Sequence, residues 1–167
     1  HNILAQLGID PEKQYGYKVL EPLQTLRKDD VRQVARALGL PAQIVSRIPF
    51  PGPALAARIV GEVTTERLQT VRAATAIVEE ELADSGAFQY LAVLLSDKAT
   101  GIREGKREYG EIVVVRCIHS TDARTAAVVE LPWEKLHRIC QRITAIAGVN
   151  RCLYDLTPKP PATVEYV

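Results

Sequence analysis

Apolar residues recur at steps of three and four positions in three stretches of this chain, the spacing of one face of an α-helix. We expect helices from Lys28 to Leu38, from Thr64 or Thr65 to Gly86, and from Pro132 to Gly148. Threonine suits the position before a helix, proline the first helical position and glycine the position after the last turn. The expected core-facing positions are Val31, Val34, Ala35 and Leu38; Leu68, Val71, Thr75, Val78 and Leu82; and Leu136, Ile139, Cys140, Ile143 and Ala147.

Runs of strand length, rich in β-branched residues, lie between and after the last two of these helices. They are Gln89 to Leu95, Glu111 to Ile118, Val149 to Leu156 and Thr163 to Val167. The resulting order, α-β-β-α-β-β, predicts an α+β fold in which two helices cover one face of an antiparallel four-stranded sheet. The other face must be covered or polar. The consecutive apolar residues 112–115 suggest burial on both faces, which favours association with a second copy.

A proline-rich segment divides the chain. Pro49, Pro51 and Pro53 alternate with Phe50 and Gly52, a pattern that is incompatible with regular structure. We interpret residues 49–53 as a rigid loop that leads into a new domain, so the expected domains are 1–48 and 49–167. Within the second domain, we expect the polar stretch 96–110 between two strands to be a mobile loop.

Composition narrows the class of protein. With 47% hydrophobic and 25% charged residues, the chain is typical of a soluble globular protein. A net charge of +1 gives no broad attraction to nucleic acid or membrane, and no apolar run approaches the roughly 20 residues that span a bilayer. No methionine is present, even at position 1, which favours a piece of a longer polypeptide. The cysteines are odd in number and lack CxxC spacing, so we expect reduced, buried thiols in a cytoplasmic protein and no metal site: Cys117, Cys140 and Cys152.

Two segments carry charges that suit a small anionic ligand. In residues 159–167, Pro160 and Pro161 stiffen the backbone between Lys159 and Glu165, with Thr163 also between them. Such a segment either holds a small molecule or is an edge strand whose charges are solvated. In the 96–110 connection, the cations either wrap a phosphate or belong to a solvated basic hairpin: Lys98, Arg103, Lys106 and Arg107.

Four blocks, in order along nearly the whole chain, carry a family resemblance. They read E-P-L-Q-T-L-R-K-D-D-V-R at 21–32, R-I-P-F-P-G-P-A-L-A-A-R-I at 47–59, G-E-V-T at 61–64, and G-V-N-R-C-L-Y-D-L-T-P-K-P-P-A-T-V-E at 148–165. These blocks closely resemble the C-terminal part of GMP synthase.

The resemblance implies a homodimer, a two-layer dimerisation domain at 49–167 and a remnant of an ATP-pyrophosphatase domain at 1–48. It also implies that this chain binds XMP and supplies no catalytic residue, metal ligand or cofactor. In the family, the ATP-pyrophosphatase domain uses ATP and Mg²⁺ to adenylylate XMP, and ammonia from a glutamine amidotransferase domain then gives GMP. The phosphate-binding loop of the former and the catalytic cysteine of the latter do not occur here. The implied XMP ligands are Pro51, Gly52, Pro53, Gln89, Arg107, Lys159, Thr163 and Glu165.

The sequence departs from the family pattern at two places. Glu104-Gly105 replaces a Gly-Asp pair before Arg107, and Tyr166-Val167 replaces a final Trp-Glu. These changes keep open a divergent dimerisation or regulatory module that has lost nucleotide binding. An RNA-binding module is another alternative, because small α+β domains with a basic loop often bind RNA. The near-zero net charge, the few aromatic residues and the missing GxxG loop argue against it.

Overall fold

The computed structural model describes residues 6–45, 55–121 and 123–166, and the chain divides into two compact units, His1–Arg47 and Ile48–Val167. The proline-rich segment 49–53 lies outside the described residues.

The first unit contains short helices with little burial. α2 (Pro11–Tyr15) begins after Asp10, whose side chain accepts hydrogen bonds from two backbone N–H groups of its first turn. α3 (Lys28–Ala37) confirms the helix expected at 28–38, and Gly39 follows it with a left-handed φ of 76°. α4 is Ala42–Val45. Leu38 is exposed, so its expected place in the core-facing stripe is wrong, whereas the other three stripe positions of α3 are half-buried.

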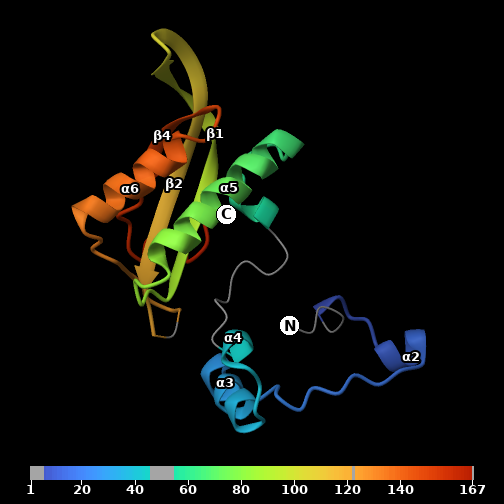
Figure 1. The fold of residues 1–167 in the computed structure, drawn as a ribbon. Helices are drawn as coiled ribbons and strands as arrows, with labels where there is room; N and C mark the ends of the chain where they lie inside the picture. The colour runs from blue at the N-terminus through green and yellow to red at the C-terminus, as the bar shows by residue number, and fades with distance from the viewer. Residues whose placement is uncertain (1–5, 46–54, 122, 167) are drawn as a thin grey trace. The chain divides into compact units, whose positions relative to one another are not determined.

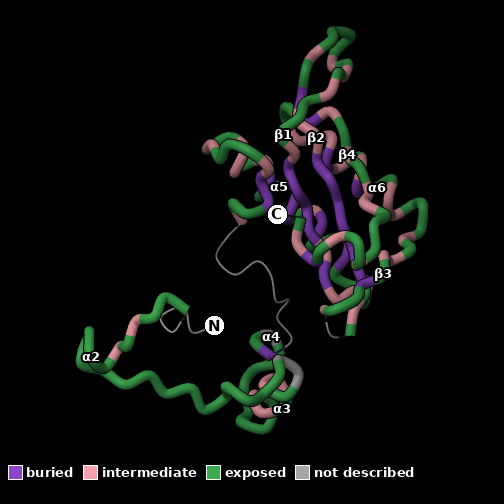
Figure 2. Tube along the Cα trace, turned by 180° about the vertical axis from the view of Figure 1, so that it is seen from behind, coloured by how far each residue is buried: buried purple, intermediate pink, exposed green. Residues whose placement is uncertain are grey.

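The second unit has the α+β architecture that the sequence predicts. The 3₁₀ helix η1 (Leu55–Arg58) precedes α5 (Thr65–Leu82), and the Thr64 hydroxyl caps α5 by accepting a hydrogen bond from the Arg67 N–H at 3.3 Å. Both long helices lie on one face of the sheet, as views from the two sides show (Figures 1 and 2). The remaining elements are β1 (Gln89–Arg103), β2 (Lys106–His119), β3 (Ala127–Val128), α6 (Trp133–Thr144) and β4 (Val149–Tyr154).

The sheet is mixed rather than antiparallel, which corrects the expected topology. β1 pairs antiparallel with β2 along nearly its whole length. β4 instead runs parallel to β2, with Val113 opposite Cys152 and Val115 opposite Tyr154. Parallel neighbours need a crossover connection, and α6 supplies it between β2 and β4. Because β1 occupies one edge of β2, β4 and β3 share the other edge.

The strand expected at 163–167 is wrong as well. Residues 163–166 form no strand, and the fourth strand is the short β3, in which Ala127 pairs with His119 of β2. Pro160 and Pro161 lack the N–H groups that a strand ladder requires, which explains why pairing stops after an isolated bridge between Lys159 and Ala126.

The stretch 96–110 is a β-hairpin and not a mobile loop. β1 and β2 continue through it, with Thr100 opposite Tyr109. Glu104 and Gly105 form the turn with φ of 51° and 77°, the positive values that a type I′ turn requires and that glycine accommodates. We call residues 96–110 the hairpin arm, because the end of this hairpin projects beyond both helices and is exposed (Figures 1 and 2).

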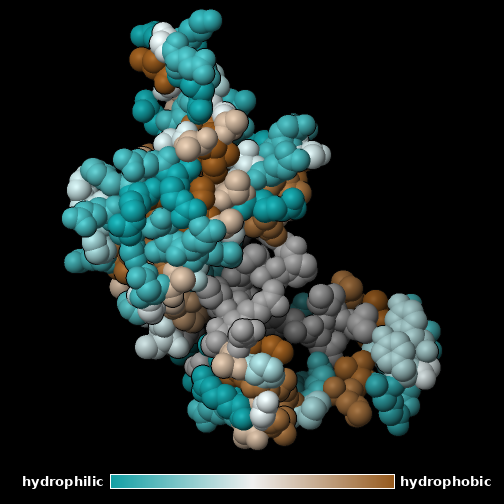
Figure 3. Space-filling model, viewed as in Figure 1, coloured by the Kyte–Doolittle hydropathy of each residue, from teal (hydrophilic) through white to brown (hydrophobic). Residues whose placement is uncertain are grey.

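The main core lies between the sheet and the two helices. The α5 residues that periodicity predicts to face inward are buried, apart from the half-buried Leu68. On α6, Ile139 and Ile143 are buried, but the helix ends at Thr144. Ala147 is therefore exposed, contrary to expectation, and Ile146 packs against the core instead. The outward sides of α5 and α6 are largely hydrophilic, with an apolar strip between them (Figure 3).

The helix-free face of the sheet is also buried over its central part. Val114 is 3% exposed and packs with Leu91 and Val93, with half-buried Val60 and Leu95 beside them. The apolar run on β2 is therefore buried on both faces, as expected. However, Val114 is buried within one chain, so this run gives no argument for a second copy.

Candidate functional site

Glu165 joins the C-terminal segment to η1 and β1. Its carboxylate accepts hydrogen bonds from the Arg58 guanidinium, with Nε 3.3 Å from Oε2 and Nη2 3.1 Å from Oε1, and another from Nε2 of Gln89. Arg58 and Gln89 are 1% and 0% exposed, while Glu165 is partly open to solvent. Because a buried guanidinium needs a charged acceptor, these side chains depend on one another. We call them the Glu165 cluster.

Arg116 makes a second contact between the sheet and the same segment. It lies on β2, and the positions on either side of it face the helices, so its side chain is directed to the helix-free face. The residue is fully buried. Nη1 donates to Asp155 Oδ2 and to the Thr157 carbonyl, both at 2.7 Å, and Nη2 donates to the Thr163 carbonyl at 2.9 Å. One guanidinium thus holds three points of the chain after β4.

Asp155 remains ionised beside Arg116. Burial by itself raises the pKa of the Asp155 carboxyl, but hydrogen bonds from Thr157 and the positive charge of Arg116 outweigh burial, so the pKa is lowered. The Thr157 N–H donates to Asp155 Oδ1 at 2.8 Å. This ion pair is therefore present at neutral pH and fixes the course of the chain as it leaves β4.

A cavity of about 330 Å³ opens beside these contacts, and we call it the tail cavity. Gln89 and Arg116 are diagonal neighbours on β1 and β2, since Gln89 pairs with Ile118 and Arg116 pairs with Leu91. Among the described residues, Oε1 of Gln89 and Nε of Arg116 are buried without a hydrogen-bond partner, which is rare for buried polar atoms. The helix-free face therefore keeps an unused acceptor and an unused donor. The tail cavity is lined by Arg116, Asp155, Thr157, Pro161, Ala162, Thr163, Glu165 and Tyr166.

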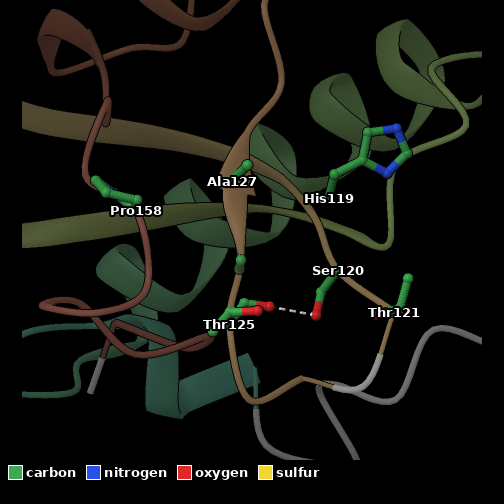
Figure 4. Close-up of a pocket in the computed structure, with 7 residues that line it drawn as sticks. His119, Ser120, Thr121, Thr125, Ala127 and Pro158 are labelled. Carbon is green, nitrogen blue, oxygen red and sulfur yellow. Dashed lines mark hydrogen bonds between the residues drawn. The ribbon is translucent and has the colours of Figure 1, made fainter.

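Lys159 contacts a neighbouring loop. Its backbone pairs with Ala126, and its ammonium group donates to the Ala123 carbonyl at 2.7 Å. Ala123 has a φ of 61°, which is unfavourable for a residue with a side chain. Ser120 stabilises this turn, because its hydroxyl accepts from the Ala123 N–H at 2.9 Å. The same hydroxyl donates to the Thr125 carbonyl at 2.6 Å, as Figure 4 shows.

A second cavity, of about 450 Å³, follows this loop (Figure 4). Thr157 lines the tail cavity and Pro158 lines this second one, so the chain passes from one cavity to the other immediately before Lys159. The second cavity is lined by hydroxyl groups, one imidazole and small apolar side chains, and no Asp, Glu, Lys or Arg is among the described residues that line it. These residues are His119, Ser120, Thr121, Thr125, Ala126, Ala127 and Pro158.

Arg107 lies on the hairpin arm, apart from the other expected ligands of the same chain. It is exposed and pairs with Ile102 near the turn, whereas Gln89 pairs with Ile118 at the opposite end of β2. The separation along β2 is about 11 residues, or roughly 36 Å at about 3.3 Å per residue. An arginine side chain does not bridge that distance.

The structure therefore divides the expected ligand set. Thr163 and Glu165 line the tail cavity, and the Thr163 hydroxyl donates to the Glu165 carbonyl. Gln89 does not line the cavity but donates a hydrogen bond to the Glu165 carboxylate. Lys159 lies in the adjoining segment, and Arg107 lies far along β2. The ligands expected at 51–53 fall outside the described residues.

Sequence reasoning missed Arg58 and Arg116, which hold the C-terminal segment in place. A signal was present, because each arginine stands inside an apolar run, Leu-Ala-Ala-Arg-Ile-Val for Arg58 and Val-Val-Val-Arg-Cys-Ile for Arg116. A charged side chain within a buried element needs an acceptor. The run itself does not tell which residue supplies that acceptor.

The cysteines are free, and Cys117 is buried while Cys140 and Cys152 are half-buried. Burial raises the pKa of the Cys117 thiol to about 11 and that of Cys152 to about 12. Within the described ranges, no group of three His, Cys, Asp or Glu side chains is arranged to hold a metal ion. In the same ranges, no helix has the length and apolar character needed to cross a membrane.

A comparison with protein families matches residues 76–166 to the GMP synthase C terminal domain. The match extends over just over half of the chain. It contains most of the residues described above, including Gln89, Arg116 and the whole segment from β4 to Glu165. Arg58 lies outside it.

Curated proteins with related sequences match nearly the whole chain. The chain is 51% identical to a glutamine-hydrolyzing GMP synthase subunit from Methanopyrus kandleri over 99% of its own length. It is 53% identical to the equally named protein from Archaeoglobus fulgidus over 91% of its length, and 51% identical to that from Pyrococcus furiosus over 99%. These matches cover 54%, 50% and 52% of the relatives, so the chain spans about half the length of the curated relatives it matches.

Proposed function

The chain belongs to the GMP synthase C-terminal domain family, and from this premise we propose that it binds XMP and forms the homodimer in which XMP is aminated to GMP. The observation that carries the proposal is the Glu165 cluster beside the tail cavity. It combines a fixed carboxylate, Glu165, from the C-terminal block that resembles the family with an unused buried acceptor, Oε1 of Gln89.

Each proposed ligand has a part of XMP that suits its chemistry. Glu165, oriented by Arg58 and Gln89, accepts hydrogen bonds from ribose hydroxyls or from N–H groups of the purine. Lys159 pairs with the phosphate by giving up its hydrogen bond to the Ala123 carbonyl, because a dianion is the stronger acceptor. Thr163 supplies a hydroxyl at the rim of the same cavity. Binding of the phosphate and ribose, which do not react, positions the purine for amination.

Arg107 joins this site only if a second copy supplies it. Within one chain it is roughly 36 Å along β2 from the end that carries the Glu165 cluster, at about 3.3 Å per residue. In a homodimer, the hairpin arm of one copy reaches the tail cavity of the other and presents Arg107 to the phosphate. The exposed position of Arg107 near the end of a projecting hairpin supports this arrangement.

The bond-making steps belong, in this proposal, to the half of the relatives that the chain does not span. There, ATP and Mg²⁺ activate the purine oxygen of XMP, and ammonia from a glutamine amidotransferase part displaces AMP. The first unit is then the end of the ATP-pyrophosphatase domain, with residues 1–48 on that side of the boundary. In this proposal, residues 51–53, Pro-Gly-Pro, also bind the nucleotide, because a glycine without a side chain permits the backbone to come close to it. This chain supplies binding and assembly and no catalytic residue.

Calorimetric titration of XMP into the chain tests the proposal, with IMP, which lacks the C2 oxygen, as the control ligand. We expect saturable binding of XMP that Arg107→Ala weakens and that Lys106→Ala, the neighbouring cation of the arm, leaves nearly unchanged. Sedimentation equilibrium should show a dimer for all these chains. Absence of XMP binding, both alone and with the ATP-pyrophosphatase part added, would refute the assignment of the site.

A mixing experiment tests the contribution of the second copy. Arg107→Ala chains and Glu165→Gln chains should each bind XMP weakly. After mixing and subunit exchange, each mixed dimer has one site with an intact arm and an intact Glu165, so part of the binding should return. Failure of mixing to restore any binding, with exchange verified, would place Arg107 outside the site.

One observation favours a second candidate, a dimerisation or regulatory module that has lost nucleotide binding. Both carboxylate oxygens of Glu165 already accept hydrogen bonds within the chain. The same titration separates the two, because such a module forms the dimer and does not bind XMP.

A further inference from the structure

The C-terminal segment after β4 is held mainly by side chains. The Asp155 N–H still donates to the Val115 carbonyl at 2.9 Å, and Lys159 bridges to Ala126. Beyond Lys159, the backbone hydrogen bond that the described residues show is local, from the Ala162 N–H to the Pro158 carbonyl at 3.0 Å. The part of the chain that carries Glu165 therefore depends on other contacts for its position.

Arg116 holds both ends of the loop that this segment forms. On the same guanidinium, Nη1 serves the Thr157 carbonyl and Nη2 serves the Thr163 carbonyl, while Asp155 balances the charge. The use of two nitrogens is important, because the guanidinium is planar and rigid, so donors on Nη1 and Nη2 fix the positions of their two acceptors relative to each other. The loop between Thr157 and Thr163 is thereby closed on the surface of β2.

We propose that Arg116 is a positioning residue for nucleotide binding at the tail cavity. It fixes the Thr163 carbonyl, and Glu165 follows two residues later, so its carboxylate meets Arg58 and Gln89 in a single geometry. This inference rests on the proposed function, since it assumes that XMP binds there. Arg116 acts through the backbone of the segment. Without Arg116, the segment becomes ordered only when the nucleotide binds, and the conformational entropy lost in that step lowers the affinity.

Stability alone is a poor reason for this arrangement. A buried ion pair is often no more stabilising than well-packed apolar side chains of similar volume, because both charges lose their hydration. Arg116 has hydrophobic neighbours in sequence on both sides, and two of its three hydrogen-bond acceptors are backbone carbonyls. What these contacts supply is one defined path for the segment that carries Glu165.

The test compares Arg116→Lys and Arg116→Gln with the unchanged chain. Lysine keeps the charge beside Asp155 but places all its donors on one nitrogen, so it loses the Thr163 contact; glutamine loses the charge as well. Arg142→Lys is the matched control, because Arg142 bridges α6 to Glu80 and Glu81 of α5, away from the segment. Each chain is measured for XMP affinity by calorimetry, for hydrogen exchange of the peptide 160–166, and for its unfolding midpoint.

We expect Arg116→Lys to weaken XMP binding by about tenfold or more and to speed exchange in 160–166, with exchange in α5 and α6 unchanged. Arg142→Lys should leave both measurements unchanged. If Arg116→Gln does not fold, Asp155→Asn provides a milder loss of the same anchor and should shift affinity and exchange together. Normal XMP affinity in Arg116→Lys despite faster exchange would overturn the positioning role alone. No XMP binding by the unchanged chain would overturn the proposed function and this inference with it.

Discussion

Replacing Gly110 by alanine tests how the hairpin arm is attached to the sheet. Gly101 and Gly110, on β1 and β2, both lie against the side chain of Asn150 on β4, whose Nδ2 donates to the Ala99 and Glu108 carbonyls at 3.3 Å. A Cβ at position 110 would lie 2.5 Å from Cγ and Nδ2 of Asn150 and 2.6 Å from the Gly148 carbonyl oxygen. The side chain can turn away, but the carbonyl is held by the Glu111 N–H at 2.7 Å.

The loss in the free energy of unfolding that Gly110→Ala causes can be worked out from these contacts. Overpacking by a methyl group costs about 1–3 kcal/mol, and each hydrogen bond lost from Asn150 costs about 1 kcal/mol. Alanine recovers about 0.5–1 kcal/mol relative to glycine through lower backbone entropy in the unfolded chain. We therefore expect Gly110→Ala to lower the free energy of unfolding by about 3 kcal/mol if both Asn150 hydrogen bonds are lost, which at a urea m-value of about 2 kcal/mol/M moves the midpoint down by about 1.5 M.

Urea unfolding followed by circular dichroism is the appropriate assay, because the two longest of the described helices, α5 and α6, both belong to the second unit. Gly101→Ala is the matched control, since the three atoms nearest to its Cβ would all be side-chain atoms of Asn150, at 2.5–2.8 Å. In an Asn150→Ala background, Gly101→Ala should become nearly neutral, whereas Gly110→Ala should still destabilise because the Gly148 carbonyl remains. Complete rescue of Gly110→Ala by Asn150→Ala would refute the reasoning.

Three further predictions concern charge and thiol chemistry. Glu165→Gln should weaken XMP binding by about tenfold or more and lower the urea midpoint, because buried Arg58 loses its charged partner; unchanged XMP affinity in calorimetry would contradict this. Cys117 and Cys152 should react with a thiol reagent at about pH 8 far more slowly in the folded than in the unfolded chain, because their raised pKa values leave little thiolate; fast labelling of the folded chain would contradict it. The lowered pKa of Asp155 gives stability that is present above about pH 4 and is lost as the pH falls through the folded pKa. Asp155→Asn should therefore flatten the acid side of the stability profile measured by urea unfolding, and an unaltered acid slope would count against the Arg116 contact.

Local patterns predicted the three longer helices and their starts to within one residue, whereas α5 ends at Leu82 and α6 at Thr144, before the expected Gly86 and Gly148. The inward positions of α5 follow from the spacing of Val71, Thr75 and Val78, and Gly39 ends α3 because a left-handed residue suits that position. The family resemblance added a set of expected ligands, of which Thr163 and Glu165 line the tail cavity and Gln89 is hydrogen-bonded to Glu165. These features depend on neighbours in sequence, or on blocks that can be compared directly, so they are visible without a structure.

The strand pairing was harder to predict. The apolar run of β4 indicates a strand but carries no information about direction, which is decided by the α6 crossover. The sequence of the hairpin arm resembled that of a loop, because most of its residues face solvent on both sides of the hairpin and are therefore largely polar. The Glu104-Gly105 turn is recognised only in the structure, from the positive φ values of both residues. The segment 163–166 has strand-like composition, but the preceding prolines remove the donors that pairing needs.

By itself, the sequence determined most of the segments that form helices and strands, the α+β class and the family, because each of these is encoded in local spacing or in contiguous motifs. Only the tertiary structure decided that Arg58 and Arg116 are buried partners of the C-terminal segment and that Arg107 lies far from Glu165 along the same chain. The reason is that a buried charge is stabilised by acceptors from distant parts of the sequence. Arg58 and Glu165 are separated by 107 positions, and only folding brings them within hydrogen-bonding distance.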